Sequence, residues 1–189
     1  MEKILIATNN YGKVKEIKEI LDKYELLTLK DLNVNIEVEE DGKTFEENSL
    51  KKAKVIYEKT KIPCIADDSG LCIDKLDNWP GVYTARFIGD ETTRRKRNLE
   101  IIEKMKNLQG EERKARFVCV VTYYNNGKIV VGKGEIIGKI SENPRGDNVF
   151  GFDEIFELDN GKTLAELTLE EKNKIISRKI AIQEIKDKI

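Results

Sequence analysis

The stretch that decides the fold runs from residue 62 to residue 73 and reads IPCIADDSGLCI. Its first part, residues 62–66, is a short apolar run of the kind that forms a buried strand, and residues 71–73 continue it in extended form. Between the two parts lie the adjacent acids Asp67 and Asp68. The sequence therefore predicts a buried strand with charged groups at its end.

Apolar runs and helical spacing alternate along the rest of the chain. Period-two alternation over residues 34–38 favours a strand, and Asn125-Asn126-Gly127 between two long segments is a strong hairpin signal. Expected strands span residues 4–7, 26–29, 34–38, 62–66, 71–73, 115–124, 128–140 and 154–158; expected helices span 11–22, 44–59, 91–108 and 168–189. The pattern predicts one α/β domain over residues 1–189, with a long mixed β-sheet and flanking helices.

Composition excludes several classes of function. Thirty-four basic and 35 acidic side chains leave a net charge of −1, which argues against a dedicated nucleic-acid binder. The chain has no histidine, so a Ser-His-Asp triad, a Cys-His pair and an imidazole base are excluded. Any hydrolytic chemistry must use carboxylates, a bound metal, lysine or arginine.

Three cysteines, Cys64, Cys72 and Cys119, match neither a metal clip nor a disulfide framework, and we expect reduced core residues. The isolated Trp79 is also expected to pack rather than to line a site. No apolar run approaches membrane-spanning length and none resembles a signal peptide. We therefore expect a cytoplasmic protein with no membrane partner.

The turn Thr8-Asn9-Asn10-Tyr11-Gly12-Lys13 joins the first strand to the first helix. Backbone amides at a helix start, together with hydroxyl, amide and lysine side chains, form a reasonable phosphate cradle. The turn is not a Walker A loop, because Val14 follows where that motif has Ser or Thr. The alternative is an Asn-rich turn that caps a helix.

Asp67 and Asp68 are the second candidate site. Two adjacent acids at the end of an apolar strand are costly unless a cation is present, and magnesium bound by one or two carboxylates plus phosphates meets that need. Either aspartate could also take a proton from water. The alternative is an exposed turn.

Two further segments could carry chemistry. In the helix start at residues 44–53, Glu47 could bind metal while Lys52 reaches phosphate; alternatively, Glu47 closes a capping box with Thr44. A second capping-box pattern begins at Thr168. The last segment combines Phe150-Gly151-Phe152-Asp153 with Lys172, Ser177 and Arg178, where an aromatic ring could stack on a base and polar groups could read a purine edge. The alternative there is a core aromatic pair and a solvated helix face.

Taken together and in this order, these segments resemble the inosine triphosphate pyrophosphatase family, which hydrolyses deaminated purine triphosphates such as ITP, dITP and XTP. TFEENSLKKA at residues 44–53 is similar to the family's TFxENxxxKA, and DDSG at 67–70 is followed by PGVYTAR at 80–86. The FGFD loop at 150–153 and the EKN lysine, Lys172, continue the pattern. The resemblance implies two lobes around a nucleotide cleft, a homodimer, and hydrolysis to a monophosphate and pyrophosphate.

The resemblance also implies a role for each site residue. Asp68 would be the general base and would bind Mg²⁺ together with Glu47. The triphosphate would be held by Thr8, Asn9, Asn10, Tyr11, Gly12, Lys13 and Lys52. The nucleotide site would be lined by Ser69, Phe150, Gly151, Phe152, Asp153, Lys172, Ser177 and Arg178.

The chain departs from the family at Ser177, where the family has histidine, so the resemblance does not fix the base preference. At about 100° per residue, Lys172, Ser177 and Arg178 would point in three directions from one helix. We therefore predict a helix break between Lys174 and Ser177. The alternative functions are a related pyrophosphatase for pyrimidine or modified nucleotides, a nucleotide-binding module without hydrolysis, and a phosphatase that releases orthophosphate.

Overall fold

The computed structural model describes residues 2–84, 87, 94–148 and 151–189, and the chain divides into two compact units. Unit 1 comprises Met1–Ser69, Cys119–Gly134 and Ser177–Ile189; unit 2 comprises Gly70–Val118 and Glu135–Ile176. The two units agree with the two lobes that the resemblance implies, whereas the cleft stays a prediction.

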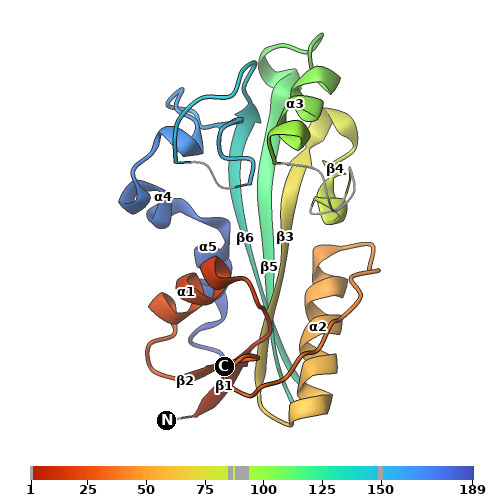
Figure 1. Ribbon diagram of the computed structural model, residues 1–189, viewed down its shortest axis with the longest axis vertical. Helices are drawn as coiled ribbons and strands as arrows, with labels where there is room; N and C mark the ends of the chain where they lie inside the picture. Colours follow the sequence, from red (N-terminus) through yellow and green to blue (C-terminus); the bar gives the residue numbers. More distant parts are fainter. Residues whose placement is uncertain (1, 85–86, 88–93, 149–150) are drawn as a thin grey trace. The chain divides into compact units, whose positions relative to one another are not determined.

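The strands form one mixed sheet in the order β2-β1-β3-β5-β6-β7, with β4 paired to β3 (Figure 1). Their bounds are β1 Lys3–Ile6, β2 Glu25–Thr28, β3 Cys64–Ile73, β4 Trp79–Pro80, β5 Lys114–Asn125, β6 Lys128–Ile140 and β7 Phe156–Glu157. Strand β1 is parallel to β2 and β3, and β7 is antiparallel to β6. The mixed sheet with its helices confirms the predicted α/β class.

Helices cover both faces of the sheet in unit 1. Helices α1 (Tyr11–Ile20) and α5 (Ser177–Ile185) lie on one side and α2 (Phe45–Thr60) on the other (Figure 1). Successive strand residues point to opposite faces, so Ile4 packs with α1 and α5 while Leu5 packs with α2. A strand that is buried on both faces must be apolar throughout, which explains the run at the start of the chain.

Unit 2 has its own core around the far end of β3. Its described residues include the helices α3 (Arg94–Lys104) and α4 (Leu169–Ile175). They also include short 3₁₀ helices, at η1 Asp74–Leu76, η2 Gly81–Tyr83, η3 Gly110–Arg113 and η4 Leu164–Glu166. Leu71 and Ile73 of β3 pack there with Ile101 of α3. Trp79 contacts this core and meets Phe87 edge-on, with ring centroids 4.7 Å apart. The prediction that Trp79 packs is confirmed.

Local signals in the sequence placed the turns and helix starts correctly. Thr44 Oγ1 accepts a hydrogen bond from the backbone N–H of Glu47 (3.1 Å), and Thr168 caps α4 in the same way. Asn126 and Gly127, with φ of 44° and 92°, form the two-residue turn between β5 and β6. Positive φ at both positions is typical of a type I′ hairpin, and the predicted hairpin is confirmed.

The predicted break in the last helix is also confirmed. Helix α4 ends at Ile175, Ile176 is extended with φ −64° and ψ 130°, and α5 begins at Ser177. A Cβ on Gly134 of β6 would lie only 1.9 Å from the carbonyl oxygen of Ser177. The start of α5 therefore lies directly against the backbone of β6, where only glycine fits.

The expected strand at residues 34–38 is wrong. Ile36 is buried, and Val34 and Val38 pack against the same core as α2, so the alternation correctly marks which side chains are covered. The segment itself has no regular secondary structure. Period-two burial does not require that the backbone pairs with another strand.

Helix α3 is shorter than the expected span of residues 91–108. Residues 91–93 lie outside the described part of the chain, and the helix ends at Lys104. The guanidinium of Arg113 donates to the carbonyl oxygens of Met105 (2.6 Å) and Leu108 (3.2 Å). A cation that binds carbonyls beyond a helix C-terminus stabilises that end.

All three cysteines are free and buried, as predicted. Burial raises the pKa of Cys119 to about 12, so the thiol stays protonated. Among the described residues, no helix is both long and apolar enough to span a membrane.

Candidate active site

The prediction that the two acids lie at a strand end is wrong: β3 runs through them from Cys64 to Ile73, because Asp67 and Asp68 are buried within the sheet rather than exposed in a turn. The two acids face opposite sides of the sheet. Asp67 is 1% exposed and Asp68 is 7% exposed. Because neighbouring residues of a strand point in opposite directions, Asp67 meets groups from α1 and α5, whereas Asp68 meets a group from α2. Two residues that are equivalent in the sequence thus have different surroundings.

Asp67 is a buried anion held between two cations. Its Oδ2 accepts from Lys13 Nζ at 2.8 Å and from Arg178 Nε at 3.1 Å. Arg178 is also ion-paired with Glu16 and lies 3.4 Å from Ser69 Oγ. Burial alone would raise the pKa of Asp67, but the charges on Lys13 and Arg178 outweigh it and hold the pKa well below its usual range. Asp67 is therefore ionised, and its Oδ2 is bound by both cations.

Asp68 has neutral partners instead. Its Oδ2 accepts from the side-chain amide of Asn48 at 2.9 Å, and its Oδ1 accepts from the backbone N–H of Ser69 at 2.9 Å. Burial raises the pKa of Asp68 above its ordinary value, and the negative charge of Glu40 raises it further, against the lowering effect of the Asn48 bond. Asp68 is thus the more basic of the two carboxylates.

Lys52 of α2 contacts β3 at the two acids. It lies four residues after Asn48, on the same face of α2, and its ammonium donates to the backbone carbonyl of Asp67 at 2.9 Å. It also forms an ion pair with Glu40. Sequence reasoning missed Glu40, because it lies in the irregular segment before α2, where no periodicity marks it.

The carboxylate of Glu47 is used by its own helix start. Its Oε2 accepts from the backbone N–H groups of Lys43 (2.6 Å) and Thr44 (3.3 Å), which is the capping-box alternative. The described residues contain no group of three or more Asp, Glu, Cys or His side chains that could hold a metal ion. The metal role of Glu47 stays a prediction.

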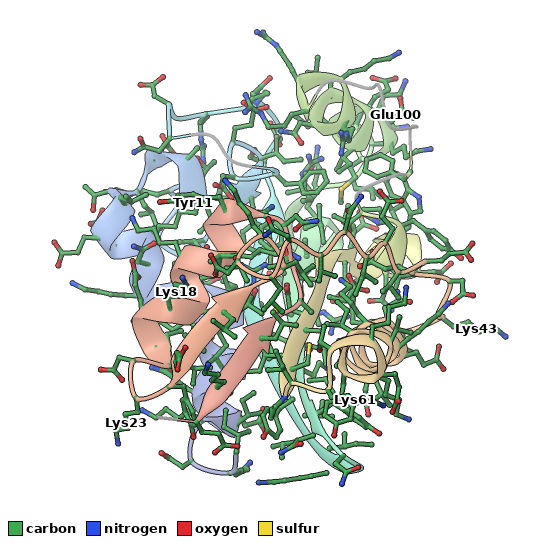
Figure 2. All side chains as sticks on the ribbon, turned by 60° about the horizontal axis from the view of Figure 1, so that its bottom comes forward. Tyr11, Lys18, Lys23, Lys43, Lys61 and Glu100 are labelled. Atoms are coloured by element: carbon green, nitrogen blue, oxygen red, sulfur yellow. The ribbon has the colours of Figure 1, made fainter. Side chains whose placement is uncertain are left out.

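The turn between β1 and α1 also shows the capping alternative. Asn10 Oδ1 accepts from the backbone N–H groups of Gly12 (3.0 Å) and Lys13 (3.3 Å), and Thr8 Oγ1 accepts from Asn10 N. Tyr11 stands at the start of α1 and is 81% exposed (Figure 2). A cavity of about 170 Å³ adjoins the turn, with polar walls from Thr8, Asn9 and Lys52 and apolar walls from Ala7, Leu29, Ile36, Val38 and Ile56.

The other expected site residues lie partly in unit 2. There, Asp153 and Lys172 form an ion pair, and Phe152 is buried in the core beside Phe117, which matches the core-aromatic alternative. Gly151 has a positive φ of 58°, and Phe150 lies outside the described residues. In unit 1 the structure brings together Lys13, Lys52, Asp68, Ser69 and Arg178; Ser177 is buried next to Arg178.

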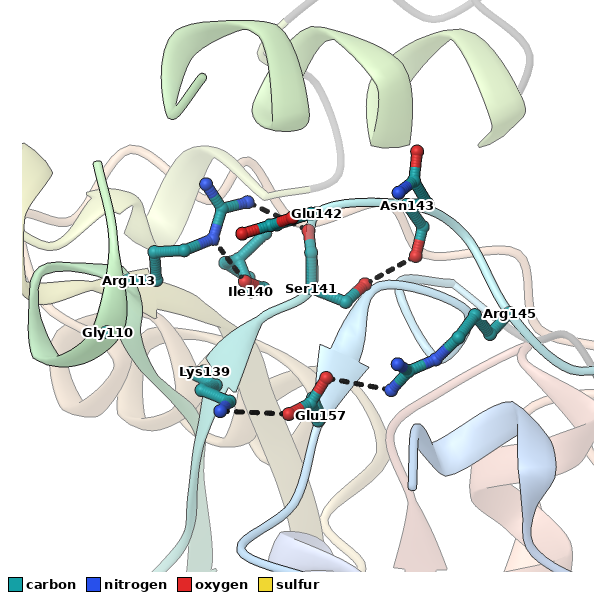
Figure 3. Close-up of a pocket in the computed structure, with 9 residues that line it drawn as sticks. All are labelled: Gly110, Arg113, Lys139, Ile140, Ser141, Glu142, Asn143, Arg145 and Glu157. Carbon is teal, nitrogen blue, oxygen red and sulfur yellow. Dashed lines mark hydrogen bonds and ion pairs between the residues drawn. The ribbon is translucent and has the colours of Figure 1, made fainter. Parts of the chain in front are cut away.

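Unit 2 also contains a cavity of about 300 Å³ lined by several charged side chains. Figure 3 shows Glu157 between Lys139 and Arg145, at 2.9 and 2.7 Å. Arg113 donates to the backbone carbonyls of Ile140 (2.6 Å) and Ser141 (2.8 Å). We interpret this cavity as a structural junction between the end of β6 and its neighbours.

Comparisons with known proteins agree on one family. The model of the Ham1 family matches residues 4–188. The dITP/XTP pyrophosphatase of Clostridium perfringens is 43% identical, over 100% of this chain and 98% of the relative, and that of Geobacter sulfurreducens is 44% identical, over 99% and 96%. The solved structure of a HAM1 protein from Coxiella burnetii matches with a TM-score of 0.91 at 34% identity, over 99% of this chain and 98% of the other.

Proposed function

Because the chain belongs to the Ham1 family, we propose that it hydrolyses deaminated purine nucleoside triphosphates, such as ITP, dITP and XTP, to the monophosphate and pyrophosphate. Relatives at more than 40% identity carry the name dITP/XTP pyrophosphatase. The observation that carries the proposal is the part of β3 at Asp67 and Asp68: three cations, Lys13, Arg178 and Lys52, bind Asp67, and the adjacent Asp68 is a buried carboxylate with no cationic hydrogen-bond partner among the described contacts.

The cations suit a polyphosphate. Lys13 and Arg178 are already fixed by Asp67, and Lys52 by the backbone of the same residue. Phosphoryl transfer depends mostly on positioning and on neutralising charge, so groups that are held in place before the substrate binds are effective. We propose that these three side chains bind the triphosphate, together with the turn at Thr8–Asn10.

We assign the general base to Asp68 rather than to Asp67. A base must be able to accept a proton from the attacking water. Asp67 is paired with two cations that keep its pKa low, whereas burial raises the pKa of Asp68. Asp68 is therefore the carboxylate that fits proton abstraction.

Magnesium fits the carboxylates on the side of β3 that faces α2, at Asp68 and Glu40. Glu40 is ion-paired with Lys52, which lies four residues after Asn48 on α2, and its negative charge raises the pKa of Asp68; Mg²⁺ commonly uses one or two carboxylates plus substrate phosphates. Of the two glutamates, Glu40 fits better than Glu47, whose carboxylate closes the capping box. When bound, the ion would neutralise phosphate charge; Asp68 would still hold and move the proton.

The test is a panel of ITP, XTP, ATP, dUTP and dTTP with magnesium, in which both the product and the base preference are measured. We expect pyrophosphate as the product and ITP and XTP as the best substrates. Preference for dUTP or dTTP, release of orthophosphate, or tight binding without hydrolysis would each refute the proposal and favour one of its alternatives.

The matching variant is Asp68→Asn, with Asp31→Asn as the control. We expect Asp68→Asn to fold and to lose turnover by about 10²–10⁴-fold, the usual contribution of a general base. Asp31 lies in a surface turn, and its variant should keep the wild-type rate. Normal turnover in Asp68→Asn would remove Asp68 from this role.

We also propose that residues 1–189 act as one catalytic domain, that the protein is a cytoplasmic homodimer, and that Phe150, Gly151, Asp153, Lys172 and Ser177 contact the nucleoside. The ion pair between Asp153 and Lys172 supports a polar recognition group in unit 2. Light scattering coupled to gel filtration tests the dimer, and a monomer at working concentrations would contradict it.

A further inference from the structure

We propose that Asn48 is a positioning residue whose side-chain amide fixes the direction in which Asp68 presents its carboxylate. The inference rests on the proposed function, because it concerns the carboxylate that we assign as the base. Asn48 itself is 1% exposed, so it acts through Asp68 and not on the substrate.

Three hydrogen bonds define the arrangement. The backbone N–H of Gly42 donates to Asn48 Oδ1 at 2.8 Å, and Asn48 Nδ2 donates to Asp68 Oδ2 at 2.9 Å. The other oxygen of Asp68 accepts from the backbone N–H of Ser69 at 2.9 Å. Each oxygen of Asp68 therefore has its own donor, and a rotation of the carboxylate would break at least one bond.

The amide of Asn48 can adopt only one of its two orientations. An N–H group such as that of Gly42 needs an acceptor, and an ionised carboxylate accepts but cannot donate. With the amide reversed, Nδ2 would face the N–H of Gly42 and Oδ1 would face Asp68, so two buried contacts would become repulsive. An unsatisfied buried polar group costs about 1–3 kcal/mol, which makes the reversed state rare.

The same side chain links Asp68 to the segment that carries Glu40. Gly42 is two residues after Glu40, and a Cβ at Gly42 would lie 2.6 Å from Asn48 Oδ1. The absence of a side chain at Gly42 allows the backbone to come close enough to hold the amide. We infer that Asn48 keeps both proposed metal-facing acids, Glu40 and Asp68, in fixed positions.

The first experiment compares Asn48→Ala with Ser49→Ala. Ser49 is the next residue of α2, equally buried, and its hydroxyl bonds to Thr122 at 2.7 Å, away from Asp68. Each variant removes two hydrogen bonds, those of Asn48 with Gly42 and Asp68 and those of Ser49 with Thr122 and the carbonyl of Glu46, so the two should lose similar stability. We expect kcat for ITP to fall about a hundredfold in Asn48→Ala, with KM within about threefold of wild type, because the loss concerns the reacting geometry. Ser49→Ala should keep kcat.

A second variant moves the amide without removing it. Gly42→Ala pushes on Asn48 Oδ1 and should lower kcat in the same direction, although Gly42 has no side chain that could touch the substrate. In the Asn48→Ala background the 2.6 Å contact with Oδ1 is gone and only the 2.9 Å contact with Glu47 Cβ remains, so Gly42→Ala should lower kcat by a smaller factor there than in the wild-type protein. Additive losses would contradict the inference, as would equal kcat losses in Asn48→Ala and Ser49→Ala.

A third readout does not depend on activity. The side-chain amide resonances of Asn48, identified in an ¹⁵N spectrum by their absence in Asn48→Ala, should shift in Asp68→Ala and stay unchanged in Asp31→Asn. Unchanged resonances in Asp68→Ala would overturn the inference whatever the protein hydrolyses. Failure of the proposed function would instead appear in the wild-type protein, as absent pyrophosphate release.

Discussion

Gly134→Ala is the sharpest test of how the fold positions Arg178. The added Cβ would lie 1.9 Å from the carbonyl oxygen of Ser177 and 2.8 Å from the backbone nitrogen of Ala181. Both are backbone atoms of α5, so neither can rotate away. Since real Cβ contacts stay beyond 3.0 Å, either β6 or the start of α5 must move by about 1 Å.

This displacement should cost both stability and activity. Overpacking of this kind costs about 1–3 kcal/mol, and for a chain of this length each kcal/mol lowers Tm by about 2–4 °C. Arg178 follows Ser177 directly, and its Nε lies 3.1 Å from Asp67, so a shift of about 1 Å breaks that bond. A misplacement of this size can reduce kcat/KM by about a hundredfold.

The assay combines thermal unfolding by circular dichroism with kcat/KM for ITP. The control is Ile129→Val, five residues earlier on β6 at an exposed position, for which the free energy of unfolding should change by less than about 0.5 kcal/mol. A Gly134→Ala protein with wild-type Tm and wild-type kcat/KM would refute the close contact between β6 and α5 and the argument built on it.

Three further predictions concern stability and metal binding. Arg113→Met should lower the free energy of unfolding by at least about 2 kcal/mol in urea titrations, because buried carbonyls at the ends of α3 and β6 lose their donor; a smaller loss would contradict this. Burial would raise the pKa of Glu157, but hydrogen bonds from Lys139 and Arg145 outweigh it and hold that pKa below its usual range. The ionised Glu157 therefore stabilises the fold above the ordinary glutamate pKa, and this stabilisation is lost as the pH falls through the lowered pKa of the folded state. The Tm difference between wild type and Glu157→Gln should therefore shrink from about pH 6 to about pH 3, and a constant difference would exclude this linkage. Glu40→Gln should raise the magnesium concentration for half-maximal rate about tenfold or more, whereas Glu47→Gln should lower Tm and leave that concentration unchanged; the opposite result would favour Glu47 as the ligand.

Local structure could be predicted well from the sequence because its causes are local. Thr44 caps its own helix together with Glu47 three residues later. An Asn-Gly pair between two strands favours positive φ at both residues, as Asn126 and Gly127 show. The break before Ser177 was predicted from helix geometry together with the family resemblance, which assigns Lys172, Ser177 and Arg178 to one site. The wrong strand prediction at residues 34–38 has a cause that is not local. Burial there is periodic, but strand pairing depends on whether a free strand edge lies nearby.

Only some residues of the candidate site could be predicted from the sequence. Lys13, Lys52 and Asp68 could be predicted as candidate site residues because they belong to recognisable segments. Glu40 and Asn48 were missed, since one lies in an irregular segment and the other looks like an ordinary polar residue of a helix. Their importance comes from contacts over 12 and 20 positions in the sequence, to Lys52 and Asp68.

By itself the sequence determined that the chain is α/β, that any hydrolysis must proceed without histidine, and that two adjacent acids follow a buried apolar run; that the strand continues through them to Ile73 was not predicted. Only the tertiary structure decided the electrostatic surroundings of each acid. Side chains alternate along a strand, so Asp67 turns toward Lys13 and Arg178 and becomes a fixed counter-ion, while Asp68 turns toward Asn48 and keeps a raised pKa. The two faces of one sheet provide the two electrostatic environments that adjacent, identical residues cannot create alone.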